Sequence, residues 1–101
     1  MTYIYPAIFS EDENGAMNVN FPDFEACFTY GKNLADALSM AEDVLSLTLF
    51  SMEKSDTAPP AASDIRELQT KSREFSTLIK CDTDDYAEYF ALKENLSKKN
   101  I

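Results

Sequence analysis

The acidic side chains of this chain are the first candidates for a functional site. Glu11, Asp12 and Glu13 are consecutive, and Asp23 and Glu25 follow a little further along. Grouped carboxylates can hold a divalent cation, act as general acids and bases, or attract a basic partner. A calcium-binding loop would show acidic residues at alternate positions and a distant closing glutamate, and this pattern is absent. The spacing therefore favours partner binding over metal binding.

The remaining reactive residues do not indicate a catalytic site. The chain has no histidine, so the commonest general base and metal ligand is missing, and serine and cysteine nucleophiles lack their usual base. Neither Gly15 nor Gly31 begins a phosphate-binding loop. Helix capping explains Asp82, Asp84 and Asp85 better than metal ligation does. We therefore predict no enzymatic activity, no cofactor, no metal ion and no catalytic residue.

The charge of the chain is strongly negative and unevenly placed. Eighteen acidic residues stand against nine basic ones, which gives a formal net charge of −9 and an isoelectric point near 4.3. Residues 1–57 hold ten acidic and two basic side chains, whereas the remainder is nearly balanced. Two interpretations stay open: a solvated face that aids solubility, or a docking surface that accelerates association with a basic protein. The candidate contacts for such a partner are Glu11, Asp12, Glu13, Asp23 and Glu25.

Composition disfavours several partners and locations. An acidic domain matches a phosphate backbone poorly, and the one mildly basic stretch, residues 93–99, holds three lysines and a glutamate. Tight direct binding to nucleic acid is therefore not expected. No apolar run approaches the roughly 20 residues of a membrane span, and the N-terminus does not resemble a signal peptide. Cys27 and Cys81 lie in apolar runs and are expected to be buried free thiols, as in a cytoplasmic protein.

Local patterns predict the elements that position these residues within a single domain, residues 1–101. Alternating aromatic and β-branched residues indicate strands, Asn14-Gly15 indicates a hairpin turn, and apolar spacings of three and four after the N-cap residue Asn33 indicate a helix. The predicted elements are strands near residues 2–10, 16–22, 26–31 and 74–81, a main helix over residues 34–54 and a terminal helix starting between Asp82 and Asp84. Residues 55–62 form a proline-containing linker, and residues 96–101 a flexible tail.

The order of these elements predicts an α+β fold. The first three strands form an antiparallel meander, followed by the main helix, a fourth strand and the terminal helix. A right-handed crossover through the helix would place the fourth strand parallel to the first. The first strand is apolar on both faces, and one helix covers one face of a sheet, so we expect at least a dimer.

A series of motifs goes beyond composition. In order along residues 5–41 they are Tyr5-Pro6-Ala7, the acidic turn at residues 11–15, Phe21-Pro22-Asp23, Cys27-Phe28-Thr29, Gly31 and an Ala- and Leu-rich helix start. Together they resemble the N-terminal domain of the HicB family of antitoxins. Residues 75–79 and Asp82 with Asp85-Tyr86 resemble that family's fourth strand and last helix, and Pro59-Pro60 falls at its linker.

The resemblance implies a partial ribonuclease-H-like fold. It also implies that the chain binds and neutralises a small basic ribonuclease toxin of the HicA type in a type II toxin–antitoxin system. Glu25 and Ala26 stand where the family usually has Pro-Gly, and the chain looks like a stand-alone form without a C-terminal DNA-binding domain. The alternative is an orphan HicB-like domain or a weak metal-dependent nuclease. A small basic open reading frame beside the gene would distinguish the two.

Overall fold

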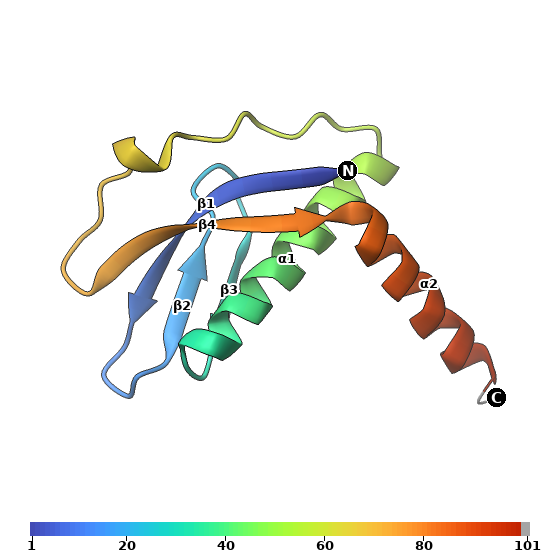
Figure 1. The fold of residues 1–101 in the computed structure, drawn as a ribbon, viewed down its shortest axis with the longest axis horizontal. Helices are drawn as coiled ribbons and strands as arrows, with labels where there is room; N and C mark the ends of the chain where they lie inside the picture. The colour runs from blue at the N-terminus through green and yellow to red at the C-terminus, as the bar shows by residue number, and fades with distance from the viewer. Residues whose placement is uncertain (100–101) are drawn as a thin grey trace.

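The computed structural model describes residues 1–99, with side chains as far as Glu94. It is a mixed α+β fold, as predicted, in which one four-stranded sheet carries two helices (Figure 1). Of the expected flexible tail, residues 96–101, the backbone of residues 96–99 belongs to the last helix, and residues 100 and 101 lie outside the described residues. The elements, in chain order, are β1 (Thr2–Glu11), β2 (Met17–Asn20), β3 (Phe28–Gly31), α1 (Leu34–Lys54), the short 3₁₀ helix η1 (Ile65–Glu67), β4 (Glu74–Asp82) and α2 (Thr83–Lys99).

The sheet is antiparallel throughout, in the order β3-β2-β1-β4. The predicted meander of β1, β2 and β3 is confirmed. The prediction that the fourth strand runs parallel to the first is wrong, because β4 pairs antiparallel to β1 with Thr2 opposite Asp82. The reason lies in the connection after α1. Residues 55–73 run back along the length of the sheet before β4 begins, so β4 enters from the opposite end (Figure 1).

The core lies between α1 and one face of the sheet. Four helix residues one turn apart, Ala37, Ala41, Leu45 and Leu49, are fully buried, as the predicted apolar stripe requires. They pack on alternate residues of the strands. The sheet residues of this cluster are Tyr5, Ala7, Phe9, Met17, Val19, Ile79 and Cys81, joined by Phe21 and Cys27 from the β2–β3 loop. Leu38, which neighbours this stripe on the helix, is 40% exposed.

The opposite face of β1 is only partly covered. Pro6 is buried and Ile8 is half-buried, but Ile4 is 50% exposed. Proline cannot donate to a strand ladder, and its place in β1 fits this limit. Asp12, just after β1, donates its N–H to Ala16 C=O, so the backbone groups of Ile8 and Ser10 face β2 as well. The β1–β2 ladder stops at Ile8. The nitrogen of Pro6 therefore points beyond the end of that ladder.

The β1–β2 hairpin is closed by Asp12 and Gly15. Asp12 Oδ1 accepts from the amides of Asn14 (2.8 Å) and Ala16 (3.0 Å), and Gly15 has a φ of +84°. The turn expected at Asn14-Gly15 is confirmed in place, but only the glycine takes the left-handed conformation. The helix start is also as predicted: Asn33 Oδ1 accepts from Asp36 N–H, and α1 has the predicted bounds.

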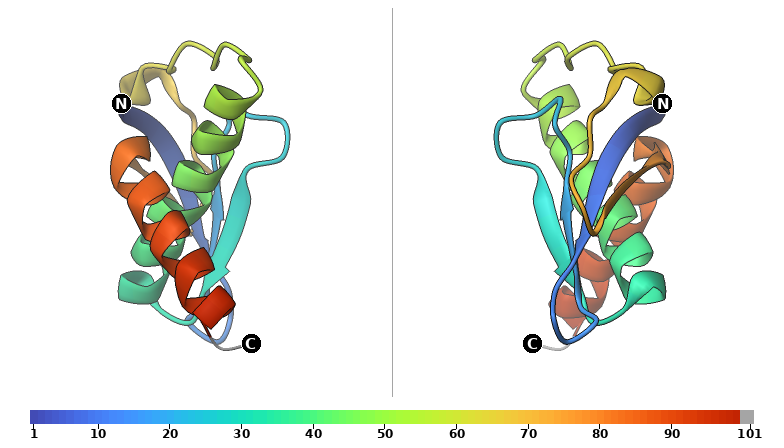
Figure 2. Two further views of the ribbon diagram at one scale, coloured as in Figure 1. Left: turned by 90° about the vertical axis from the view of Figure 1, so that its right-hand side faces the viewer. Right: turned by 90° about the vertical axis from the view of Figure 1, so that its left-hand side faces the viewer.

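Helix α2 leaves the end of β4 and packs beside α1 (Figure 2). Phe50 of α1 contacts Tyr86 and Phe90 of α2, with ring centroids 5.3 and 5.9 Å apart. At the start of α2, Glu53 Oε2 accepts from both Tyr3 Oη and the buried Thr83 Oγ1, each at 2.8 Å. This carboxylate therefore ties β1, α1 and α2 together.

The Tyr3–Glu53 hydrogen bond predicts a loss of stability at alkaline pH. The bond to the carboxylate favours the neutral phenol and raises the pKa of Tyr3 from 10.0 to about 12. An unfolded tyrosine ionises near 10, so this contribution is present below pH 10 and disappears as pH rises toward 12. Tyr3→Phe should be less stable than the wild type near pH 9, and the difference should shrink or reverse near pH 11. Denaturant unfolding of both proteins measures this, and a constant difference would argue against it.

Candidate partner-binding surface

The structure divides the five predicted acidic contacts between the two ends of β2. Glu11, Asp12 and Glu13 lie at the β1–β2 hairpin, whereas Asp23 and Glu25 lie in the β2–β3 loop at the other end of the strand (Figure 1). Two strand ends separated by a whole strand do not form one site. The five residues therefore offer two separate acidic patches.

Two of these five carboxylates have structural roles. Asp12 holds the hairpin turn through the two amides described above. Asp23 accepts hydrogen bonds from both the backbone N–H (2.9 Å) and the hydroxyl of Ser63, which fixes the long linker against the β2–β3 loop. Glu11, Glu13 and Glu25 are exposed and remain available to a partner.

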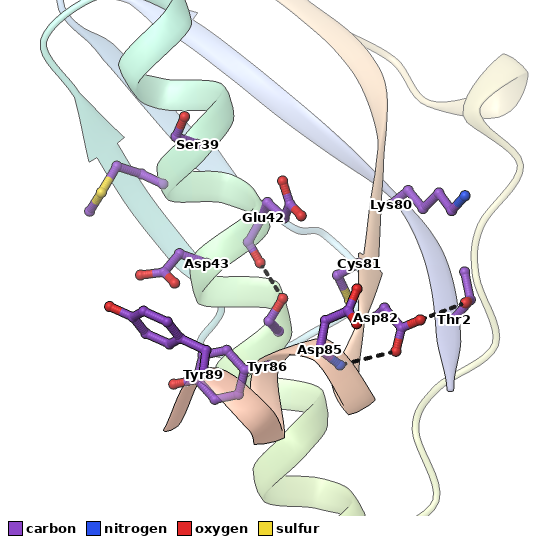
Figure 3. A pocket seen from close by; sticks show the side chains of 12 residues that line it. Thr2, Ser39, Glu42, Asp43, Lys80, Cys81, Asp82, Asp85, Tyr86 and Tyr89 are labelled. Carbon is purple, nitrogen blue, oxygen red and sulfur yellow. Dashed lines mark hydrogen bonds between the residues drawn. The ribbon is translucent and has the colours of Figure 1, made fainter. Parts of the chain in front are cut away.

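A larger acidic surface lies in an open cleft between α1, β4 and α2 (Figure 3). Its volume is about 650 Å³. Glu42 and Asp43 come from α1, Asp85 from the first turn of α2, and Lys80 from β4. The complete lining is Thr2, Ser39, Met40, Glu42, Asp43, Ser46, Lys80, Cys81, Asp82, Asp85, Tyr86 and Tyr89.

Three carboxylates of this acidic cleft have no structural role. Asp82 caps α2, because its Oδ1 accepts from the amide of Asp84 at 2.8 Å, and this bond lowers the pKa of Asp82. Glu42, Asp43 and Asp85 are exposed, and none forms an ion pair with a residue whose side chain is described. The cleft therefore presents three unpaired negative charges, and Lys80 extends away from Glu42 and Asp43 on the other side of β4 (Figure 3).

Aromatic and apolar groups adjoin these charges. Tyr89 is 57% exposed and Met40 is 39% exposed. Tyr86 is half-buried, and burial, with the neighbouring charge of Asp43, raises its pKa, so the ring stays neutral. Carboxylates next to tyrosine faces suit lysine and arginine side chains, through ion pairs and cation–π contacts.

The floor of the acidic cleft is inert. Cys81 is buried there, and burial raises the pKa of its thiol, so the reactive thiolate is disfavoured. Ser46 is buried too, and its hydroxyl donates to Glu42 C=O at 2.7 Å. Cys81 and Cys27 are both free and buried, as predicted. Within the described residues, no three histidine, cysteine, aspartate or glutamate side chains gather closely enough to hold a metal ion.

A family model for the HicB-like antitoxins of bacterial toxin–antitoxin systems matches residues 5–96. The chain belongs to this family. The predicted resemblance is thus confirmed, and the match extends through the linker, β4 and most of α2 of this HicB-like chain. Among curated proteins, none matches its sequence significantly.

Solved structures support the same assignment. A toxin–antitoxin complex from Streptococcus pneumoniae contains a chain 28% identical to this one, with a TM-score of 0.77 over 85% of this chain and 73% of the other. A chain of a HicA3 and HicB3 toxin–antitoxin complex is 21% identical, with a TM-score of 0.63 over 79% and 99% of the two chains. The N-terminal domain of Burkholderia pseudomallei antitoxin HicB is 15% identical, with a TM-score of 0.63 over 76% and 95%. The last two, at lower identity, show the fold.

Sequence reasoning missed the acidic cleft of this HicB-like chain. Its walls come from three elements that are far apart in sequence, and only the position of β4 and the angle of α2 bring them together. The one available signal was the polar face of the main helix, where Glu42 and Asp43 interrupt the apolar spacing. None of the helices in the described part of the chain has the length and apolarity needed to cross a membrane.

Proposed function

We propose that this HicB-like antitoxin binds and neutralises a small basic ribonuclease toxin of the HicA type. The acidic cleft is the main contact, and it receives lysine or arginine side chains of the toxin. The exposed residues Glu11, Glu13 and Glu25 act as outlying charges that steer the toxin toward the chain. The proposal places both molecules in the cytoplasm.

The observation that supports this proposal most is the set of three unpaired carboxylates in a cleft with exposed tyrosine. Exposed carboxylates that form no ion pair within the chain are available to a partner of opposite charge. Membership of an antitoxin family supplies the class of partner, and one similar structure is described as a HicA3 and HicB3 complex. The net charge of −9 favours a basic toxin over an acidic one.

Binding should depend on salt. Purified antitoxin is titrated with a HicA-type toxin, for which a small basic open reading frame beside the gene would be the first candidate, and the association rate is measured at increasing ionic strength. The rate should fall as salt rises, because the Debye length shrinks from about 30 Å at 0.01 M to about 8 Å at 0.15 M. Absence of any complex at low salt would refute the proposed partner, and a salt-independent rate would refute electrostatic steering.

The nuclease alternative receives no support from the geometry of the described residues. Metal-dependent cleavage of nucleic acid needs several carboxylates converging on metal ions, whereas the free carboxylates here are spread along the walls of an open cleft. We therefore also propose that the chain is not an enzyme and does not bind DNA tightly by itself. RNA cleavage by the pure protein that is lost in Asp12→Asn or Asp23→Asn would reverse this assignment.

A further inference from the structure

The strand β3 is an unprotected edge of the sheet. It lies first in the order β3-β2-β1-β4, so no strand covers its outer side. Its four residues, Phe28–Gly31, include no charged residue and no proline, the groups that usually blunt an exposed edge. The other edge, β4, differs because it carries Glu74 and Lys80.

The register of β3 fixes which backbone groups are free. Phe21 N–H donates to Cys27 C=O at 2.9 Å, so Cys27 faces β2, and with it Thr29 and Gly31. Alternation then turns the N–H and C=O groups of Phe28 and Tyr30 away from the sheet. These two residues offer four backbone groups to a neighbouring strand.

The side chains of the same two residues are exposed apolar rings. Phe28 is 67% exposed and Tyr30 is 54% exposed, on the face of the sheet opposite α1. Their neighbours across β2 are Asn20 and Asn18, which give the rings no apolar cover. Phe28 and Tyr30 therefore combine unpaired backbone N–H and C=O groups with exposed rings, which indicates that another strand binds at this edge.

We propose that β3 pairs with β3 of a second copy of this chain, antiparallel, about a two-fold axis at Thr29. In this register Phe28 of each copy lies opposite Tyr30 of the other, so both free amide and carbonyl pairs are used and each ring meets a ring. The pairing joins two four-stranded sheets into one. It is independent of toxin binding, because the acidic cleft lies beside the opposite edge, β4.

Charge supports a second copy as the occupant. Exposed Lys32 directly follows β3 and exposed Glu25 precedes it, so antiparallel pairing brings the positively charged end of β3 in each copy toward the negatively charged end in the other. Pairing through four residues per chain is small compared with the roughly 1,200–2,000 Å² of stable complexes, so the dimer should be weak and concentration-dependent.

Cysteine cross-linking tests both the pairing and its register. Residues at a non-hydrogen-bonded antiparallel pair have Cα atoms about 4.5 Å apart, within the range of a disulfide. Thr29→Cys should therefore form a disulfide-linked dimer under mild oxidation. Phe28→Cys is the matched control. In the proposed register the two introduced cysteines would be displaced by two residues along the strands, so their Cα atoms would lie beyond the roughly 7 Å that a disulfide can bridge. The wild type controls for the buried Cys27 and Cys81.

The result expected is a linked dimer for Thr29→Cys alone, together with a concentration-dependent mass by light scattering for the wild type. Tyr30→Lys, which places a charge at the free edge, should scatter as a monomer while keeping the wild-type circular dichroism. A wild-type monomer at all concentrations, efficient linking through Phe28→Cys, or no linking through a folded Thr29→Cys would each overturn the proposal. Occupation of β3 by the toxin, seen as protection of this edge only in the complex, would do so as well.

Discussion

Neutralising the three free carboxylates of the acidic cleft is expected to weaken toxin binding by roughly 100-fold. The variant is Glu42→Gln/Asp43→Asn/Asp85→Asn, which keeps side-chain size and removes charge. Each interfacial charge pair contributes about 1 kcal/mol, and three together give about 3 kcal/mol. Calorimetric titration with the same HicA-type toxin measures the loss. All three residues are exposed and form no ion pair with the described side chains, so the fold should be retained.

A second triple variant provides the matched control. Glu11→Gln/Glu13→Gln/Glu25→Gln removes the same number of charges from the hairpin and the β2–β3 loop. Its main effect should be a slower association, with an affinity loss below about tenfold, because such charges act mainly on encounter. If this variant loses most of the affinity and the first does not, the toxin contacts the hairpin and the loop, and the cleft assignment is wrong.

Gly31→Ala is expected to destabilise the protein by about 3 kcal/mol, the upper part of the range for overpacking. A Cβ at Gly31 would lie 2.8 Å from Ala37 Cβ and closer still to the backbone N and Cα of Ala37. Neither β3 nor the first turn of α1 can yield without moving the other. Since 1 kcal/mol shifts the Tm of a domain this size by roughly 4–8 °C, the Tm should fall by more than about 10 °C.

Gly15→Ala separates crowding from backbone conformation. A Cβ at Gly15 has no heavy atom within 4 Å, but the φ of +84° disfavours a side chain. Its cost should be about 1 kcal/mol, from backbone strain alone. Equal losses in the two variants would show that the close approach of β3 and α1 at Gly31 does not limit stability.

Short-range chemistry in the sequence predicts most of the elements. Asn33 and the apolar spacing after it give both ends of α1, because an N-cap and an amphipathic stripe are local properties. The hairpin at Gly15 and the inward face of β1 follow equally from turn chemistry and alternation. In each of these the information lies within a few residues of the element.

Long-range geometry explains what the sequence could not predict. The direction of β4 depends on the path of residues 55–73, which Asp23 and Ser63 help to fix by a contact across 40 positions. The acidic cleft depends in turn on the direction of β4 and the placement of α2. Local patterns also could not show that the carboxylates of Asp12 and Asp23 accept hydrogen bonds from backbone amides and a hydroxyl within the chain.

Inhibition of a ribonuclease by the purified chain would be the strongest evidence that it acts as an antitoxin. The purified chain is added in increasing amounts to a HicA-type toxin, and cleavage of an RNA substrate is followed. Cleavage should fall in proportion to the added antitoxin and stop near one chain per toxin. Undiminished cleavage in the presence of excess folded chain would show that the chain does not neutralise this toxin.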